Sequence, residues 1–336
     1  MRFRLLKGSL GLLRKFAATL VMSFIIGLTG AEHGVGGEIA YYSNKEGEWD
    51  WYIHIMNADG SESLQLASGG TPAWSSNGSR VAFSYGFNGF FGDEVDVFVI
   101  DVNGENRLNL TKGEYKRNLF PAWSPDGMKI AFWSNRDGQP DIYVMDADGT
   151  NPINITQDVH IEDRPTWSPD GTRIAFGALQ VPRGEQNMSD IYVMDADGAN
   201  RTNLTQNPEA VNQFPAWSPD GTRIAFEASP NPNRWFAPVN IHVMNADGSH
   251  PVMLTDERRF ASEGLPTWSP DGEIIAFHRR EPDGRDDIFI INADGTGLLN
   301  ITETLQIEEI NPAWNPAAEE ISTRERLATT WGEVKR

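Results

Sequence analysis

One pattern of apolar and turn-forming residues recurs six times along this chain. The stretch FPAWSPDGTRIAFEA, residues 214–228, has close copies that begin at Phe120, Arg164 and Leu265, and weaker ones that begin at Thr71 and Asn311. Its two β-forming segments flank Pro-Asp-Gly, in which Gly can adopt the positive φ that a tight turn requires. Each copy is therefore predicted to form two antiparallel strands.

Two further segments complete each repeat. DIYVMDADG begins at Asp141, and the short segment INIT follows it at 153–156; the other repeats carry similar pairs. The first predicts a third strand that ends in an Ala-Asp-Gly turn, and the second predicts a fourth strand. Asn-X-Thr in the fourth strands is strand pattern rather than a glycan site, at Asn109, Asn154, Asn203 and Asn300. Four aspartates open third strands and are expected to cap turns or to bond neighbouring backbone: Asp96, Asp141, Asp190 and Asp287.

The spacing of one tryptophan in each repeat predicts the fold. Successive members of this set are 49, 44, 50, 51 and 46 residues apart, which is typical of a propeller blade: Trp74, Trp123, Trp167, Trp217, Trp268 and Trp314. We therefore predict an all-β, six-bladed β-propeller of four-stranded antiparallel blades, with these tryptophans packed between blades. A stack of sandwiches is the alternative, but it would not need the same Trp hairpin in every unit.

The two ends of the repeat region predict how the ring closes. The first repeat enters at its second strand, GEIAYYS (37–43), whereas NPAW (311–314) supplies a first strand with no Pro-Asp-Gly after it. The C-terminal inner strand at 312–314 should therefore pair with the N-terminal blade and remove an open edge. The expected organisation is a signal peptide at 1–31, a propeller at 32–316 and a C-terminal tail at 317–336.

The first 31 residues predict export. Five basic residues precede the apolar run 16–28, which is short for a membrane span but suits a signal peptide, and Thr29 and Ala31 fit the cleavage positions. We expect cleavage near Ala31 and a periplasmic or secreted protein. The alternative is a chain tethered to the membrane by an uncleaved N-terminus.

The net charge and the absence of cysteine exclude several classes of partner and site. After cleavage 23 basic residues oppose 47 acidic ones, a net charge of −24, which repels nucleic acid and anionic membranes. No nucleic-acid partner and no membrane insertion after cleavage are expected. The chain has no cysteine, so it has no disulfide and no thiolate metal site.

The repeats resemble a known family. The Trp-Ser-Pro-Asp-Gly hairpin, the IYVMDADG strand and the closing Leu-Thr strand are similar to the propeller of the TolB family, over roughly residues 37–315. The resemblance implies a propeller fold and a place in the bacterial cell envelope. TolB proteins carry an α/β domain ahead of the propeller, whereas in this chain the signal leads almost directly into the first blade.

Antiparallel strands place the uniform Pro-Asp-Gly and Ala-Asp-Gly turns on one face of the ring and the variable loops on the other. We assign function to this variable-loop face, because binding residues favour variable loops on rigid scaffolds. Aromatic residues and arginine are common interface anchors. The candidate partner-binding residues are Phe87, Phe90, Phe91, Tyr115, Arg117, His160, Arg164, Trp235, Phe236, Arg258 and Arg259. The charged members lie on connectors that lead to the innermost strands, so they could rim the central channel.

No catalytic or metal motif emerges from the sequence. A calcium loop that began at Asp146 would have Gln157 in place of the twelfth-position Glu and would lack the third of its ligand positions. The six histidines show no paired spacing, and no Gly-X-Ser-X-Gly elbow occurs. We expect a non-enzymatic binding module for a protein or peptide, monomeric and without a cofactor. The alternatives are a structural envelope component, or a hydrolase or lyase acting on a carbohydrate or other small substrate. An enzyme would use His160, Glu162, Glu281 and Glu308 at the channel mouth.

Overall fold

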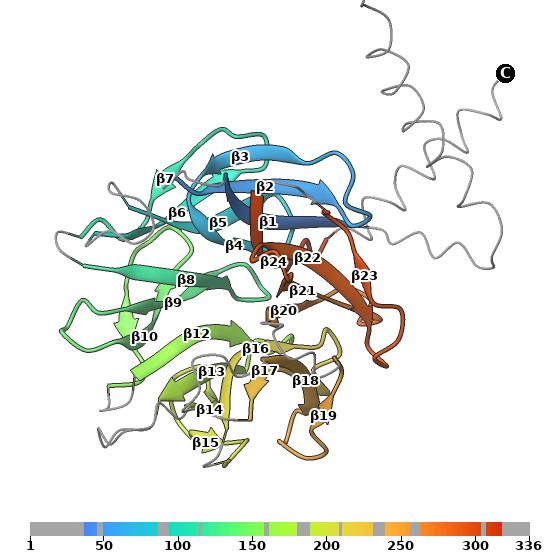
Figure 1. Ribbon diagram of the computed structural model, residues 1–336. Coiled ribbons are helices and arrows are strands. Elements are labelled where there is room, and N and C mark those ends of the chain that lie inside the picture. The colour runs from blue at the N-terminus through green and yellow to red at the C-terminus, as the bar shows by residue number, and fades with distance from the viewer. Residues whose placement is uncertain are drawn as a thin grey trace, which may run out of the picture. The chain divides into compact units, whose positions relative to one another are not determined.

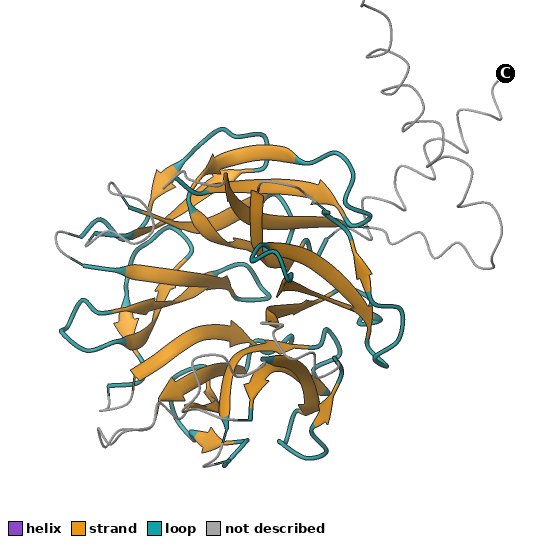
Figure 2. Ribbon diagram, viewed as in Figure 1, coloured by secondary structure: helices purple, strands orange, loops and turns teal. Residues whose placement is uncertain are grey.

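The computed structural model describes residues 37–45, 50–86, 94–113, 116–157, 161–179, 189–207, 210–230, 239–255, 263–303 and 307–317. They form 24 strands in six four-stranded antiparallel sheets, and no helix occurs among them (Figure 2). Within this part of the chain, no helix is available to cross a membrane. The predicted six-bladed propeller is confirmed.

Each sheet is one blade, and its first strand lies nearest the centre of the ring (Figure 1). From the centre outward, blade 1 consists of β24 (Ile307–Trp314), β1 (Glu38–Lys45), β2 (Tyr52–Asn57) and β3 (Leu64–Ser68). Blade 2 consists of β4 (Gly70–Trp74), β5 (Arg80–Tyr85), β6 (Asp96–Asp101) and β7 (Leu108–Asn109). Blade 3 consists of β8 (Asn118–Trp123), β9 (Lys129–Ser134), β10 (Asp141–Asp146) and β11 (Ile153–Asn154).

The remaining blades follow the same order around the ring. Blade 4 consists of β12 (Ile161–Trp167), β13 (Arg173–Leu179), β14 (Ser189–Asp195) and β15 (Thr202–Asn203). Blade 5 consists of β16 (Val211–Trp217), β17 (Arg223–Ser229), β18 (Asn240–Asn245) and β19 (Val252–Met253). Blade 6 consists of β20 (Glu263–Trp268), β21 (Ile274–Arg280), β22 (Asp286–Asn292) and β23 (Leu299–Asn300).

Blade 1 joins the two ends of the repeat region, as predicted. Strand β24 pairs antiparallel with β1, with Ile39 opposite Trp314 and Ala40 opposite Ala313. The inner strand of this blade is longer than the predicted segment 312–314, because it begins at Ile307. Backbone hydrogen bonds between the first and last strands therefore close the ring.

The hydrophobic core lies between neighbouring blades. Ala131 and Ile142 of blade 3, for example, pack with the buried side chains of Trp167, Ile174 and Phe176 in blade 4. The repeated indole lies at this junction, and in three blades its N–H donates to the preceding blade: Trp74 to Ala313 O (2.9 Å), Trp167 to Ala122 O (3.1 Å) and Trp268 to Ala216 O (3.1 Å). Trp123 is partly buried, and the side chains of Trp217 and Trp314, like those of the other three, are buried.

The aspartates that open the third strands bond side chains as well as backbone, since Asp190 Oδ1 also accepts the N–H of Asn207 at 3.3 Å. The Asp190 carboxylate accepts hydrogen bonds from Asn203 Nδ2 (2.8 Å) and Thr205 Oγ1 (2.7 Å), both in the fourth segment of the same blade. The same Thr205 oxygen accepts the backbone N–H of Ile191. Asp96, Asp141 and Asp287 bond the equivalent asparagines. The Asn-X-Thr segments therefore attach the outermost strand, which has only two residues in blades 2 to 6.

The turns of the uniform face are rigid. In blade 4, Ser168 Oγ donates to Asp170 Oδ1 (2.6 Å), which also accepts the Thr172 N–H (3.0 Å). These hydrogen bonds to the carboxylate lower the pKa of Asp170 to about 2. In the Ala-Asp-Gly turn, Gly198 has a φ of 90°, and a Cβ there would collide with the Ile155 carbonyl oxygen of blade 3. Both turns therefore need the residues that the sequence repeats.

Candidate binding site at the centre of the ring

Every inner strand contains one strained residue directly before its proline. The pairing register shifts at this point, for example between Asp163 and Thr166 of β12, as in a β-bulge. The residue before the proline takes a φ between 42° and 58°, a region that side chains other than glycine avoid: Thr71, Phe120, Arg164, Phe214, Leu265 and Asn311. Backbone strain of this kind clusters at functional sites. This position also varies from blade to blade, whereas the Pro-Ala/Thr-Trp that follows it does not.

Arg164 of blade 4 contacts residues of three other blades. Its guanidinium carbon lies 4.1 Å from the ring centroid of Phe120 in blade 3 and 4.4 Å from that of Phe214 in blade 5. Its Nη1 donates to Asn311 Oδ1 of blade 1 at 3.0 Å, and the guanidinium also bonds the hydroxyl of Tyr42. Blades 1 and 4 are opposite each other, so these groups meet at the centre of the ring. Arg164 and both phenyl rings are partly exposed there.

Two carboxyl groups adjoin this cation. Burial raises the pKa of Asp163 to about 6 and that of Glu227 to about 8, although the nearby Arg164 opposes both shifts. Glu227 Oε1 accepts the backbone N–H of Leu265 at 2.9 Å. At neutral pH Glu227 is therefore largely protonated, and Asp163 is largely ionised beside the guanidinium.

The shifted pKa of Glu227 makes stability depend on pH. Its pKa is higher in the folded chain, so folding favours the protonated carboxyl, and this stabilisation is complete below about 4.5 and lost as the pH rises through about 8. His278 works in the opposite direction, because burial lowers its pKa to about 4. Its stabilisation is present above about 6.5 and is lost as the pH falls through about 4.

The structure places two of the predicted partner-binding residues. Arg117 lies at the start of blade 3, where its N–H donates to Asn135 Oδ1 (2.8 Å) in the second-to-third strand connection, on the variable-loop side. Arg164 was expected on a connector, which is wrong, because it lies inside β12 at the bulge. The other nine lie outside the described residues: Phe87, Phe90, Phe91, Tyr115, His160, Trp235, Phe236, Arg258 and Arg259.

Sequence reasoning missed most of the central cluster. Phe120, Phe214 and Asn311 stand directly before the proline of their repeats, so variation at one position of a constant motif was the available signal. Tyr42 and Glu227 gave no such signal, since only the ring brings their blades together.

The residues proposed for an enzymatic alternative form no metal-binding group among the described ones. Glu162 is fully buried and accepts a hydrogen bond from Arg201 Nη1 (3.0 Å), whereas His160 lies outside the described residues. Glu281 is in the turn before β22, and Glu308 is near Arg280. Within the described ranges, no group of three or more His, Asp or Glu side chains could hold a metal ion.

Comparison with known proteins identifies the repeats. Residues 27–184 match the family model described as the TolB beta propeller domain. Within that range the blades are similar to those of TolB-type propellers. No protein of curated function matches the sequence.

Solved structures agree with the TolB-type fold. TolB from Acinetobacter baumannii superimposes with a TM-score of 0.70 at 23% identity, over 93% of this chain and 75% of that one. Putative TolB from Agrobacterium tumefaciens gives 0.64 at 20% identity, over 84% and 95% of the two chains. Hydrazine synthase from Kuenenia stuttgartiensis gives 0.69 at 14% identity, over 84% and 47%. These similarities establish the propeller fold.

Proposed function

We propose that this protein is an exported, non-enzymatic binding module that docks a protein or peptide on its variable-loop face. Export to the bacterial cell envelope rests on the basic and apolar N-terminal segment together with the TolB-type blades. An uncleaved N-terminus would tether the same module to the membrane. The ring is expected to act as a monomer.

The observation that carries the proposal is the partly exposed Arg164 between Phe120 and Phe214. Arginine and aromatic side chains dominate the energetics of protein interfaces, especially when a rigid scaffold holds them in place. In this ring, bulged inner strands fix all three residues. On the uniform face, the Pro-Asp-Gly turn of blade 4 is bonded within itself.

A pull-down from envelope extracts tests this proposal, with the chain from residue 32 onward as bait. One variant changes Phe90, Phe91, Trp235 and Phe236 to Ser, and a matched control changes Met128, an exposed side chain on the uniform face, to Ser. A protein captured by the wild type and the control, but not by the loop variant, supports docking on the variable-loop face. Capture that is indifferent to the loop changes, or no capture, contradicts it.

One observation favours a second candidate, an enzyme for a carbohydrate or other small substrate. Asp163, Glu227 and His278 have displaced pKa values near the centre of the ring, as catalytic groups often do. Ion-pair networks also displace pKa values, and the described residues provide no metal cluster. Turnover in a sugar and metal screen that disappears in Glu227→Gln would favour this candidate over the binding module.

A further inference from the structure

An arginine lies over a pair of aromatic rings in four of the six blades. Each pair consists of residues directly opposite each other on the second and third strands, and we call the arrangement an arginine stack. The stacks are Arg107 over Phe83 and Phe98, Arg136 over Phe132 and Tyr143, Arg201 over Phe176 and Tyr192, and Arg279 over Phe277 and Phe289. The guanidinium carbons lie 4.7–5.9 Å from these ring centroids.

In three stacks the inner strand supplies an acceptor for the guanidinium. Asn118 Oδ1 accepts from Arg136 Nη2 at 2.9 Å, and two glutamates act in the same way, Glu162 with Arg201 (3.0 Å) and Glu263 with Arg279 Nε (2.6 Å). All three acceptors stand two residues before the strained residue of their strand. The arginine of the stack comes from different positions in different blades. Arg279 lies in β21, Arg136 lies in the turn between β9 and β10, and Arg107 and Arg201 stand directly before a fourth strand.

Blade 5 has the rings and the acceptor position without the arginine. Phe226 and His242 are opposite each other with centroids 5.6 Å apart, and Asn212 stands where Asn118 does in blade 3. No arginine lies over this pair among the described residues. The three positions that supply arginine elsewhere hold Ala228, Pro230 and Pro251. In blade 1, by contrast, Ser63 Oγ bonds the Tyr41 hydroxyl beside the ring pair.

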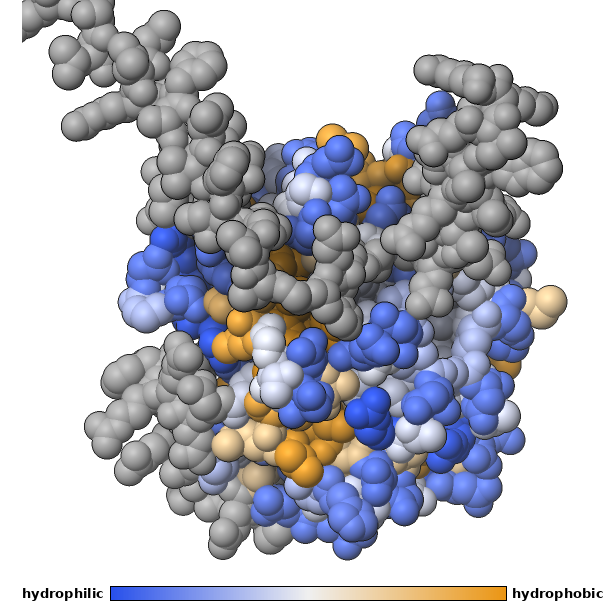
Figure 3. Space-filling view, turned by 90° about the vertical axis from the view of Figure 1, so that its right-hand side faces the viewer, coloured by the Kyte–Doolittle hydropathy of each residue, from blue (hydrophilic) through white to orange (hydrophobic). Residues whose placement is uncertain are grey.

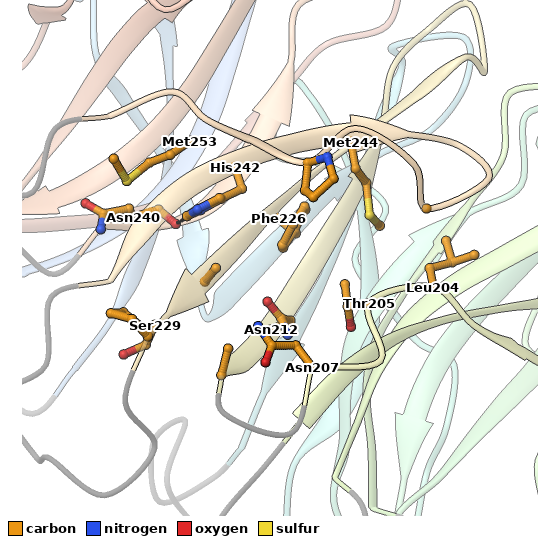
Figure 4. Close-up of a pocket in the computed structure, with 15 residues that line it drawn as sticks. Leu204, Thr205, Asn207, Asn212, Phe226, Ser229, Asn240, His242, Met244 and Met253 are labelled. Atoms are coloured by element: carbon orange, nitrogen blue, oxygen red, sulfur yellow. Dashed lines mark hydrogen bonds between the residues drawn. The ribbon is translucent and has the colours of Figure 1, made fainter.

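A cavity of about 430 Å³ lies at this place, within the usual range for ligand pockets. Phe226, His242, Met244 and Met253 form its apolar wall, and Ala228, Pro230 and Pro251 all line it (Figure 4). Apolar surface also gathers on the side of the ring that Figure 3 shows. Val252 of β19 and Leu299 of β23 are more than half exposed.

Two buried polar side chains in this pocket have atoms without a partner. Asn240 is 2% exposed and its Oδ1 accepts no hydrogen bond, while Asn212 is 4% exposed and its Nδ2 donates none. In blade 4 the equivalent of Asn240 is Asp190, which bonds Asn203; in blade 5 Met253 replaces that asparagine. A buried acceptor without a donor is costly, so the site favours a ligand that brings N–H groups.

His242 is the second ring of the pair and is neutral in this pocket. Its Nδ1 lies 3.3 Å from the Asn240 carbonyl oxygen, to which it can only donate, and this leaves the lone pair on Nε2. Burial lowers the pKa of His242, so the ring is neutral at pH 7 and does not repel a cation.

From the unfilled stack and its unpartnered acceptor we infer that the blade 5 pocket binds the arginine side chain of a partner polypeptide. The planar guanidinium matches the ring pair, and its N–H groups match Asn240 Oδ1. The net charge of the chain favours such a basic partner. None of the residues clustered around Arg164 at the centre of the ring lines this pocket.

Calorimetric titration of the full chain with blocked tripeptides tests the inference. Acetyl-Gly-Arg-Gly-amide should bind at least about tenfold more tightly than its citrulline counterpart, which keeps the shape and loses the charge. Saturation should also shift the NMR signal of the His242 ring. Equal affinities for the two peptides would overturn the inference.

Two substitutions at one position localise the binding. Pro251→Arg places an arginine where blade 4 has Arg201, so it should fill the pocket and weaken peptide binding by about tenfold or more. Pro251→Ala, the matched control, should retain wild-type affinity. Binding that survives Pro251→Arg, or is lost equally in both variants, contradicts the assignment.

Two other sources of the guanidinium are separated by the same assay. Free arginine that binds as tightly as the tripeptide would indicate a small-molecule site and overturn the polypeptide partner. Peptide binding that occurs only after Arg258 and Arg259 are changed to Ser would mean that the chain fills its own pocket, and would likewise overturn it.

Discussion

The arginine stack of blade 4 offers a direct test of how this ring is held together. Glu162 is fully buried on the inner strand, and Arg201 reaches it from the outer strand with its Nη1 at 3.0 Å from Oε1. On the way the guanidinium passes over Phe176 and Tyr192, at 4.8 and 4.7 Å from their centroids. Arg201→Met keeps most of the side-chain length and removes only the charge and its hydrogen bonds.

The expected loss of stability in Arg201→Met comes from the buried Glu162 carboxylate, which is left without its partner. Removing one partner of a buried ion pair leaves an uncompensated charge and costs about 3–5 kcal/mol. In a domain of this size each kcal/mol corresponds to about 2–4 °C, so Tm should fall by roughly 10 °C. Tryptophan fluorescence in a urea titration and calorimetry would measure both quantities.

Two controls separate burial from charge. Arg80→Met breaks an ion pair of similar length, 3.1 Å to Asp101, but Arg80 is half exposed, so the change should cost about 1 kcal/mol or less. The double variant Glu162→Leu/Arg201→Met removes both charges and should recover most of the stability. If Arg201→Met cost no more than Arg80→Met, or if the double variant were as unstable as the single one, the reasoning would be refuted.

Three further substitutions test separate parts of the structure. Glu227→Gln should flatten the decline of Tm that the wild type shows as the pH rises through about 8, and an unchanged decline would assign the titration to another group. Gly198→Ala should destabilise by about 1–3 kcal/mol more than Gly104→Ala in urea unfolding, because both have positive φ but only Gly198 faces a carbonyl oxygen of the preceding blade. Asp190→Ala should cost about 2–3 kcal/mol and increase amide hydrogen exchange in β15, which its carboxylate attaches through Asn203; protected β15 amides would contradict that role.

Some features of the central site had a signal in the sequence and others had none. The residue before each proline varies in an otherwise constant motif. This variation indicates that Arg164 and Phe120 do not belong to the repeated packing between blades. Glu227 lies in the second strand RIAFEA, which resembles the second strands of the other blades. Only the folded ring shows that its carboxyl group is buried near the charge of Arg164. The acceptor role of Glu162 was equally hidden, because its arginine comes from a segment 39 residues later.

The sequence by itself determined the blades, their number and the closure of the ring. Strands and turns depend on local sequence, and every repeat contains the same strands and turns in the same order. The fourth-strand Asn-X-Thr pattern was also visible, although its partner, the aspartate of the third strand, became clear only in the folded blade. The tertiary structure alone decided which side chains meet at the centre and which arginine stack is left unfilled. The central contacts join residues of different blades, and each stack joins different strands of one blade, so neither can be derived from a pattern within a single segment.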